Sequence, residues 1–440
     1  MHISKWKLVR RIALGSGGLV VLILALIGAS SLIRGTPVRR VIALGDRDGA
    51  PPSVHDSLFA RTMQLMADAS LERGNAVQLL SNGDGTYPQL WRDLRSATRT
   101  ITVQMYYSQP GAVADTMAAL LRERARAKVR VLLLFDAFGS QNLLKQDGYV
   151  RGLRDAGVEV ALLRPLHWYS LHKANFRSHV RVVVVDGRVG YTGGFGLADY
   201  WLGDGRHDEQ WRDANVRFAG RSVAQLQAAF AAAWAEATGV LITGDAFFPP
   251  ASFEEPGETY AGLLYAMPTT GSTNGERFMA LSIASARRTY YVANSYFVPD
   301  DDFRRLIVAA ARRGVDVRIL TAGDNTDVKT TTYAGRYRYR QLLENGVRIY
   351  EYQPSMMHAK TFVVDGLWST VGSMNYDNRS LAFNNESNLV VLDSAFGAAM
   401  DRAFLEDLNY AKEITLEADR NRPVTQKVLA WGANLLSRML

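Results

Sequence analysis

The chain has 440 residues, of which 48% are hydrophobic and 10% aromatic, enough to form buried cores in two or three domains. It contains no cysteine, which excludes disulfide frameworks, zinc–thiolate sites, iron–sulfur clusters and cysteine nucleophiles. With 51 Lys and Arg residues against 43 Asp and Glu residues, the net charge of +8 favours a polyanionic partner, either nucleic acid or anionic lipid.

A long uncharged segment near the N-terminus favours lipid over nucleic acid. The stretch Ile12 to Ile33 has no charged residue and follows a basic cluster. About 20 apolar residues suffice to cross a bilayer, so residues 1–40 are predicted to form a basic flank and one transmembrane anchor at about 12–33. A cleaved signal peptide is the alternative, although its apolar region is normally only about 7 to 15 residues long. The positive-inside rule places the basic cluster in the cytoplasm, but Arg34, Arg39 and Arg40 behind the span weaken that assignment.

From residue 41 onward, one strand–helix–strand unit occurs twice. The first copy has a strand at 100–106, an Ala/Arg/Leu-rich helix at 114–127 and a buried strand at 129–134, and the second has equivalents at 289–295, 302–313 and 315–320. In both copies a later segment, 153–160 or 343–350, predicts a helix that ends at glycine before an extended run. Strands that alternate with helices predict an α/β fold, with a mixed but largely parallel sheet flanked by helices on both faces.

The boundary between the two copies lies near residue 250. Ser222 is a suitable N-cap for a helix over 223–238, and the segment 249–258, rich in proline, predicts a linker. We therefore expect domain 1 at 41–248 and domain 2 at 259–415. The tail at 416–440 predicts an amphipathic helix with Val424, Val428, Leu435 and Met439 on one face, which either packs on domain 2 or lies in a membrane interface.

The second copy ends with polar residues suited to phosphate chemistry. His358 and Lys360 are two positions apart in a predicted strand, so their side chains share one face, and Asp365, Ser373 and Asn375 follow. A histidine can attack phosphorus or transfer a proton near neutral pH, and lysine, serine and asparagine donate hydrogen bonds to phosphate oxygens. This pattern predicts a site that handles a phosphate ester.

The first copy carries a weaker version of this motif. His179, Arg181 and Asp186 have the same spacing, but Arg181 replaces the lysine, and Gly194 and Gly196 stand where the second copy has serine and asparagine. Arginine keeps the charge in a wider planar group, whereas the two glycines remove hydrogen-bond donors. Two matches in register within a duplication support a phosphate site, while the losses leave open a degenerate first copy.

Together the two motifs resemble the paired HKD motifs of the phospholipase D superfamily, and the surrounding sequence is similar to bacterial cardiolipin synthases. The resemblance covers roughly residues 70 to 415 and extends to Phe135–Ser140, Ala311–Leu320 and Asp377–Glu386. It implies two tandem phospholipase D-like domains that form a pseudo-twofold bilobal unit, so that one chain can build one active site. It implies no metal and no other cofactor.

The resemblance also implies roles for the motif residues. One histidine becomes phosphohistidine and the other protonates the leaving alcohol; His179 would be the nucleophile and His358 the general acid and later base, although the residues alone do not distinguish the two. Lys360, Ser373 and Asn375 would hold the phosphate oxygens, and Arg181 would do so in the first motif.

Four carboxylates accompany these residues. Glu386 matches the carboxylate that would bond the other ring nitrogen of the second-motif histidine, and Asp213 resembles its counterpart for His179. A carboxylate behind an imidazole fixes its tautomer and stabilises the charged ring. Asp186 and Asp365 belong to the motifs, but each precedes a glycine at a strand end, where aspartate commonly makes a turn.

The function implied by the resemblance is a phosphatidyltransferase that converts two phosphatidylglycerol molecules into cardiolipin and glycerol through a phosphohistidine. Its expected partners are an anionic phospholipid, a second alcohol acceptor and the membrane, and the predicted span argues against nucleic acid. The expected location is a bacterial inner membrane, single-pass, with the catalytic part outside the cytoplasm. Two alternatives stay open: a phospholipase D or nuclease, since water can replace the acceptor alcohol, and a non-catalytic lipid-binding paralogue.

Overall fold

The computed structural model describes residues 17–23, 25, 38–43, 49–168, 175–250, 255–269 and 271–437. The anchor predicted at about 12–33 lies mostly outside the described residues, although residues 17–23 within it are helical. Part of the predicted linker, residues 251–254, also lies outside them. Within the described ranges, no helix has both the length and the apolar character needed to span a membrane.

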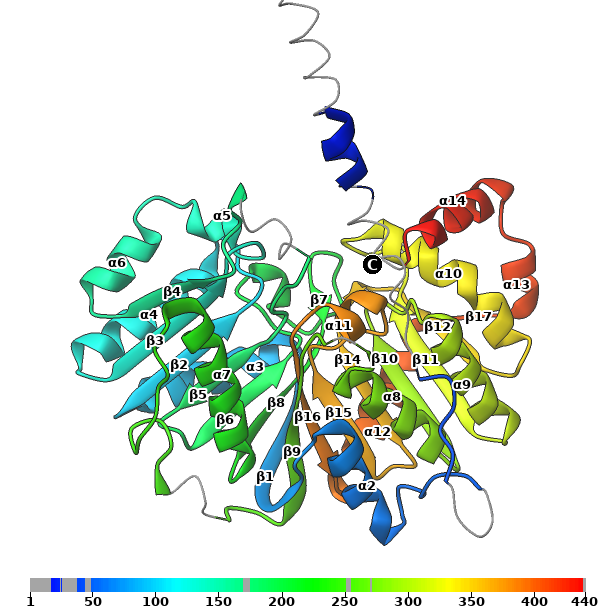
Figure 1. Ribbon diagram of the computed structural model, residues 1–440, viewed down its shortest axis with the longest axis horizontal. Coiled ribbons are helices and arrows are strands. Elements are labelled where there is room, and N and C mark those ends of the chain that lie inside the picture. The colour runs from blue at the N-terminus through cyan, green and yellow to red at the C-terminus, as the bar shows by residue number, and fades with distance from the viewer. Residues whose placement is uncertain are drawn as a thin grey trace, which may run out of the picture.

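The two copies join edge to edge in one 15-stranded sheet (Figure 1). In the first copy the strands run outward from the centre as β1 (Glu72–Ser81), β8 (Ala214–Ala219), β6 (Val189–Gly193), β5 (Val182–Val185), β2 (Thr100–Met105), β3 (Arg130–Asp136) and β4 (Glu159–Leu163). In the second copy they run as β9 (Thr259–Ala266), β16 (Glu386–Leu392), β15 (Trp368–Gly372), β14 (Lys360–Val364), β10 (Thr289–Asn294), β11 (Asp316–Ala322), β12 (Arg348–Tyr352) and β17 (Ala411–Ile414). Strands β1 and β9 pair antiparallel at the centre, and the seven strands of the first copy have counterparts in the same outward order in the second, as a pseudo-twofold axis requires. Strand β17 is added at the outer edge of the second copy.

The expectation of a largely parallel sheet is wrong. Only the pairs β2–β3, β3–β4, β10–β11 and β11–β12 are parallel within this sheet, and its other described pairs are antiparallel. The predicted strand–helix–strand units do form these parallel pairs. After them, however, the chain makes the tight hairpins β5–β6 and β14–β15, which need no crossover helix and are therefore antiparallel.

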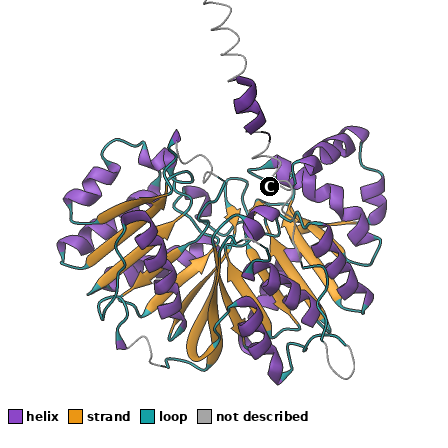
Figure 2. Cartoon of the chain, viewed as in Figure 1, coloured by secondary structure: helices purple, strands orange, loops and turns teal. Residues whose placement is uncertain are grey.

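Helices cover both faces of the sheet (Figure 2). Alternate residues of β5 show the two cores: Val183 and Val185 face one side, and Val182 and Val184 face the other. The first side is covered by α3 (Asn82–Ser96), α4 (Ala112–Arg126), α5 (Gln141–Leu144) and α6 (Tyr149–Asp155) in one copy, and by α2 (Ser57–Ala67), α8 (Asn274–Ser285), α9 (Asp301–Arg312) and α10 (Lys329–Leu343) in the other. The second side is covered by α7 (Ser222–Thr238) and α12 (Ser394–Leu408), whose apolar side chains share one core across the centre of the molecule.

The segment before β1 packs with the opposite half of the chain. Phe59 and Met63 of α2 belong to the core that contains Phe278, and the Phe59 ring meets Trp368 edge-on at 5.1 Å between centroids. The boundary predicted at residue 41 assigns α2 to domain 1, whereas its side chains complete the core of the second copy. The second half therefore depends for its packing on a segment that precedes the first.

Three further helices and a small sheet complete the described chain. They are α11 (Asn378–Ala382), α13 (Leu416–Arg420), α14 (Val424–Leu435), and the two-stranded parallel pair of β7 (Trp211–Arg212) with β13 (Met356–Met357). The pair β7–β13 lies at the centre of the molecule, between the two halves (Figure 1). It connects the first copy to the second beside the motif residues.

Candidate active site

Backbone pairing between the halves positions both histidines. The His358 N–H donates to the carbonyl of Arg212 at 2.7 Å, directly after the β7–β13 pair. On the other side of the axis, the His179 N–H donates to the carbonyl of Asn385 at 2.9 Å. Each histidine is therefore held beside the residue that precedes a carboxylate of the opposite half.

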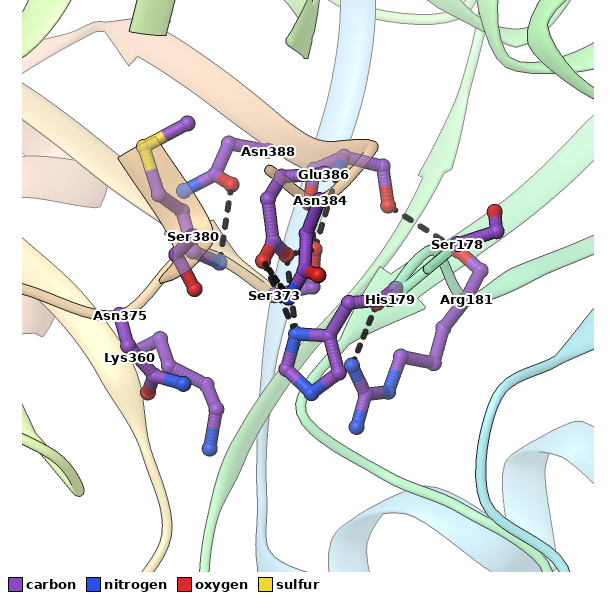
Figure 3. A network of polar contacts seen from close by, with 12 residues as sticks. Ser178, His179, Arg181, Lys360, Ser373, Asn375, Ser380, Asn384, Glu386 and Asn388 are labelled. Carbon is purple, nitrogen blue, oxygen red and sulfur yellow. Dashed lines mark hydrogen bonds and ion pairs between the residues drawn. The ribbon is translucent and has the colours of Figure 1, made fainter. Parts of the chain in front are cut away.

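This pairing places each carboxylate behind the histidine of the other copy. The Nδ1 atom of His179 lies 3.0 and 3.1 Å from the two carboxyl oxygens of Glu386 (Figure 3), and Nδ1 of His358 lies 2.7 Å from Oδ2 of Asp213. The predicted pairing, Glu386 with His358 and Asp213 with His179, is wrong. The partners are exchanged because the backbone hydrogen bonds across the axis, from His358 to Arg212 and from His179 to Asn385, set each histidine beside the carboxylate of the opposite half.

The cations of the two motifs occupy equivalent positions. Arg181 donates to the carbonyl of its own histidine, His179, at 2.5 Å, and Lys360 donates in the same way to the carbonyl of His358. Lys360 also donates to Oγ of Ser295 at 2.8 Å. The side chains of Arg181 and Lys360 approach the His179 ring from opposite sides (Figure 3), so two positive charges border the position where a phosphate would meet this ring.

The two histidine–carboxylate pairs differ in charge. Burial lowers the pKa of His179 well below 6.5, with Arg181 and Lys360 adding to the effect, and burial raises the pKa of Glu386 to about 8 despite a hydrogen bond from Ser373. Both shifts favour the uncharged forms of His179 and Glu386 in the free enzyme. In the tautomer whose Nδ1–H donates to a carboxyl oxygen of Glu386, Nε2 of a neutral His179 carries the lone pair that can act as a nucleophile.

The second pair keeps an ionised carboxylate. Burial alone would raise the pKa of Asp213, but the charge and hydrogen bond of His358, together with Lys360, lower it. Burial and Lys360 lower the pKa of His358 to about 4, with Asp213 opposing them, and burial lowers the pKa of Lys360 to about 7. An anionic phosphate in the cavity would raise the pKa of both His358 and Lys360, because a nearby negative charge favours their protonated forms.

Both histidines line a cavity of about 220 Å³ between the halves. Its aromatic wall packs against the rings: Trp211 lies 4.7 Å and Trp201 5.3 Å from the His358 ring, and Tyr106 lies 4.9 Å from the His179 ring. The sequence alone did not indicate most of the residues that line this cavity. Besides the motif residues, they are Tyr106, Tyr107, Trp201, Trp211, Tyr296, Asp327, Val328, Asp377, Arg379, Ser380 and Asn384. One signal was available, because Tyr106 and Tyr296 sit at or just after the ends of the repeated strands.

Ser373 and Asn375 have different positions relative to the cavity. Asn375 lines it and accepts a hydrogen bond from Ser295 at 3.0 Å. Ser373 is fully buried and donates to Glu386 at 2.5 Å, so it supports the carboxylate that holds His179. The structure therefore does not bring the Ser373 hydroxyl to the wall where a phosphate would bind.

The glycines of the first motif make room for other groups. A Cβ at Gly194 would lie 2.5 Å from Oδ2 of Asp213, and a Cβ at Gly196 would lie 2.7 Å from the Trp201 ring. The Trp201 indole N–H donates to Oδ2 of Asp213 at 2.7 Å. Trp201 thus donates to Asp213 as Ser373 donates to Glu386. Because Gly194 and Gly196 have no side chain, they leave room for the Asp213 carboxylate and the Trp201 ring.

Asp186 and Asp365 lie at the far ends of their strands, about 20 Å along the extended chain from the histidines. Both have a left-handed backbone with φ of 53° and begin the Asp–Gly turns of the hairpins β5–β6 and β14–β15. The Asp186 carboxylate accepts the backbone N–H groups of Thr98, Arg99 and Thr100, and Asp365 accepts the equivalent three from Arg287 to Thr289. They connect the hairpin turn to the start of the neighbouring strand and do not reach the cavity.

Comparisons with known proteins agree with this architecture. Residues 279–408 match the family described as "Cardiolipin synthase, PLD-like domain". A cardiolipin synthase of Geobacillus kaustophilus (strain HTA426) is 33% identical over 392 residues, which cover 89% of this chain and 77% of the relative. A cardiolipin synthase of Geobacillus sp. (strain WCH70) is 34% identical over 391 residues, with the same coverage of both chains. The crystal structure of a phosphatidylserine synthase from Haemophilus influenzae Rd KW20 has the same fold, with a TM-score of 0.66 at 13% identity over 87% of this chain and 100% of that one.

The duplicated fold, the two histidine motifs in one cavity and these matches define a member of the phospholipase D superfamily. Within that superfamily, the two cardiolipin synthases are more than 30% identical to this chain over more than two thirds of their own length, which identifies the family. The chain belongs to the cardiolipin synthase family and is a phosphatidyltransferase of cardiolipin synthase type.

Proposed function

We propose that the enzyme transfers the phosphatidyl group of one phosphatidylglycerol to the terminal hydroxyl of a second, with His179 as the nucleophile and His358 as the acid and base. What supports this assignment is the different environment of the two pairs. Burial and the two neighbouring cations favour an uncharged His179 beside Glu386, as a nucleophilic imidazole must be, whereas His358 is paired with Asp213, whose pKa is lowered and whose carboxylate stabilises a protonated ring.

In the first step, Nε2 of His179 attacks phosphorus and the bond from phosphorus to the glycerol oxygen breaks. His358, protonated once the anionic substrate is bound, donates its proton to that oxygen, and glycerol leaves. In the second step, His358 removes the proton from the terminal hydroxyl of another phosphatidylglycerol. The resulting oxygen attacks phosphorus, the phosphorus–nitrogen bond breaks, and cardiolipin and free His179 are released.

Other residues of the cavity would hold and align the phosphate. Arg181 and Lys360 supply the positive charge on either side of the His179 ring, and Asn375 supplies a side-chain amide on the cavity wall. The aromatic wall of Trp201 and Trp211 confines the His358 ring and would limit access of water, which would otherwise accept the phosphatidyl group.

The substrate implies a bilayer, and we propose a bacterial membrane as the site of action. The uncharged stretch from Ile12 to Ile33 supports a single-pass anchor, and the basic cluster before it supports an extracytoplasmic catalytic part. A protease-protection assay on sealed membrane vesicles, with a tag at the C-terminus, tests that orientation.

Turnover of labelled phosphatidylglycerol in detergent micelles by the purified full-length protein tests the reaction. The products to resolve are cardiolipin and phosphatidic acid, for the wild type, His179→Ala, His358→Ala and the control His207→Ala, which removes an exposed histidine away from the cavity. We expect cardiolipin from the wild type and the control and none from the other two. Phosphatidic acid as the sole product would make the enzyme a hydrolase, and equal turnover by all four proteins would remove both histidines from the mechanism.

A further inference from the structure

Helix α14 exposes its large apolar side chains and buries its small ones. Ala430, Ala433 and the following Ser437 are buried, as the side of the helix that faces the protein. Six large apolar residues are between 48% and 74% exposed: Val424, Val428, Leu429, Trp431, Leu435 and Leu436. A helix on a water-facing surface has the opposite arrangement, with its large apolar residues turned to the core.

The exposed apolar residues form one continuous face. At 100° per residue, Val424, Val428, Trp431 and Leu435 follow one line along α14. Leu429 and Leu436 lie about 110–130° further around the helix, so the exposed apolar residues span nearly half of its circumference. On the side of the helix that carries these apolar residues, Thr425 is the one polar side chain between Val424 and Leu436. The single charged residue of α14, Lys427, is positive and lies at the edge of the face. Apolar residues bordered by a cation are typical of helices that lie in an anionic membrane interface.

The position of α14 connects this face to the active site. Ala433 packs against Ala334 of α10 and Val298, and Arg338 of α10 donates to the Ser437 hydroxyl at 2.7 Å. Helix α10 begins directly after Asp327 and Val328, which line the catalytic cavity. A surface that binds α14 is therefore connected to the cavity through the single helix α10.

A second apolar element lies at the same end of the molecule. The helical residues 17–23 stand above the domains on the side of α14 (Figure 1), and Leu19 to Ile23 are exposed. The uncharged segment to which they belong is long enough to cross a bilayer. Both apolar elements lie at the same end of the molecule, and a bilayer is the partner that can cover both.

We propose that the exposed face of α14 inserts into the headgroup region of an anionic bilayer and holds the catalytic cavity beside its lipid substrate. The proposal rests on the proposed function only in taking phospholipid as the substrate; the helix face and its position stand independently. A dimer formed through α14 would cover the same face, but it would leave residues 17–23 exposed to water.

Local depth measurements test the contact directly. Because the chain contains no cysteine, Leu435→Cys in the full-length protein gives a single labelling site for an environment-sensitive fluorophore. The matched control is Leu65→Cys, since Leu65 is 66% exposed against 59% for Leu435 and lies on α2 at the opposite end of the molecule (Figure 1). Vesicles of phosphatidylglycerol and phosphatidylcholine carry lipids with a quencher near the headgroup. We expect at least about threefold stronger quenching at position 435 than at position 65. Equal quenching at both positions, or self-quenching of the 435 label in detergent without lipid, which would indicate a dimer, would overturn the proposal.

A pair of charge substitutions separates docking from chemistry. Val428→Glu with Leu435→Glu places two carboxylates on the exposed face, and Leu58→Glu with Leu65→Glu is the control on α2. We expect the α14 variant to retain turnover in detergent micelles and to lose about tenfold of its turnover on vesicles, while the control retains both. Retained turnover on vesicles would contradict docking by α14 and leave the proposed function intact. Lack of turnover by the wild type in micelles would contradict the proposed function and leave the quenching result valid.

Discussion

Replacing Gly194 by serine would give the first motif the residue of the second, and the structure predicts that this change slows the enzyme by about 10- to 100-fold in kcat. A Cβ at position 194 would lie 2.5 Å from Oδ2 of Asp213, inside the contact distance of the two atoms. Asp213 cannot retreat, since it is fully buried and its carboxylate is held by His358 and Trp201, both at 2.7 Å. Making room for the serine would break these two hydrogen bonds.

Each such bond to a buried charge contributes about 1.5–3 kcal/mol, so the variant should lose about 3–6 kcal/mol of stabilisation around His358. If half of this loss appears in the transition state, kcat falls about 10- to 100-fold. The reverse change, Ser373→Gly, removes one hydrogen bond to Glu386 without a clash and should cost about tenfold or less.

The assay is kcat for cardiolipin formation in micelles, with thermal unfolding to confirm that each variant is folded. Trp201→Phe serves as a control that keeps most of the ring and removes the indole N–H, and it should fall between the other two. Wild-type or higher activity of Gly194→Ser would refute the reasoning. It would mean that the glycines of the first motif are losses of function rather than space for Asp213 and Trp201.

Three further predictions follow from the carboxylates and the lysine. Because burial raises the pKa of Glu386 to about 8, Glu386→Gln mimics the neutral acid and should keep kcat at pH 7 within about tenfold, whereas Asp213→Asn should lower it by about 10³-fold or more; equal effects would contradict the charge difference between the pairs. Asp365→Ala leaves three backbone N–H groups without their acceptor and should destabilise the protein by about 2 kcal/mol or more in thermal unfolding, while the kcat of the folded fraction is unchanged; a large loss of kcat would place Asp365 in the chemistry. Burial lowers the pKa of Lys360 to about 7, so its positive charge in the free enzyme is lost as pH rises above 7. The value of kcat/KM for phosphatidylglycerol should therefore fall in that range. In Lys360→Met, kcat/KM should be low at every pH and should lack the part of the fall that is due to Lys360.

The two motifs were predictable because each is a local pattern. The spacing from His179 to Arg181 and from His358 to Lys360 requires no knowledge of the fold, and the duplication predicts that both lie in one molecule. Their meeting in one cavity agrees with the expectation from the family resemblance.

The pairing of the carboxylates was not predictable from local sequence. Asp213 is nearer in sequence to His179 and Glu386 is nearer to His358, so proximity along the chain indicates the wrong partners. The correct partners depend on backbone bonds across the axis, from His358 to Arg212 and from His179 to Asn385. Non-local pairing of this kind leaves no periodic signal in either strand.

The glycines of the first motif illustrate a different limit. By themselves, Gly194 and Gly196 indicate lost donors. Their role is visible only beside Asp213 and Trp201, which fill the space that side chains at these positions would need. The same applies to α2, whose apolar residues predict a helix but do not indicate which half of the chain they cover.

Covalent transfer to His179 is the central claim, and one burst experiment tests it most directly. A phosphatidyl ester of p-nitrophenol carries a leaving group that departs without a proton, so the first step no longer needs His358, whereas transfer from the intermediate still does. With this substrate, His358→Ala should release one p-nitrophenol per chain in a rapid burst and then stall, and alkaline denaturation should leave the phosphatidyl group on the peptide that contains His179. His179→Ala should give no burst. A burst from His179→Ala and none from His358→Ala would reverse the two roles, and a burst from neither would contradict a covalent histidine intermediate.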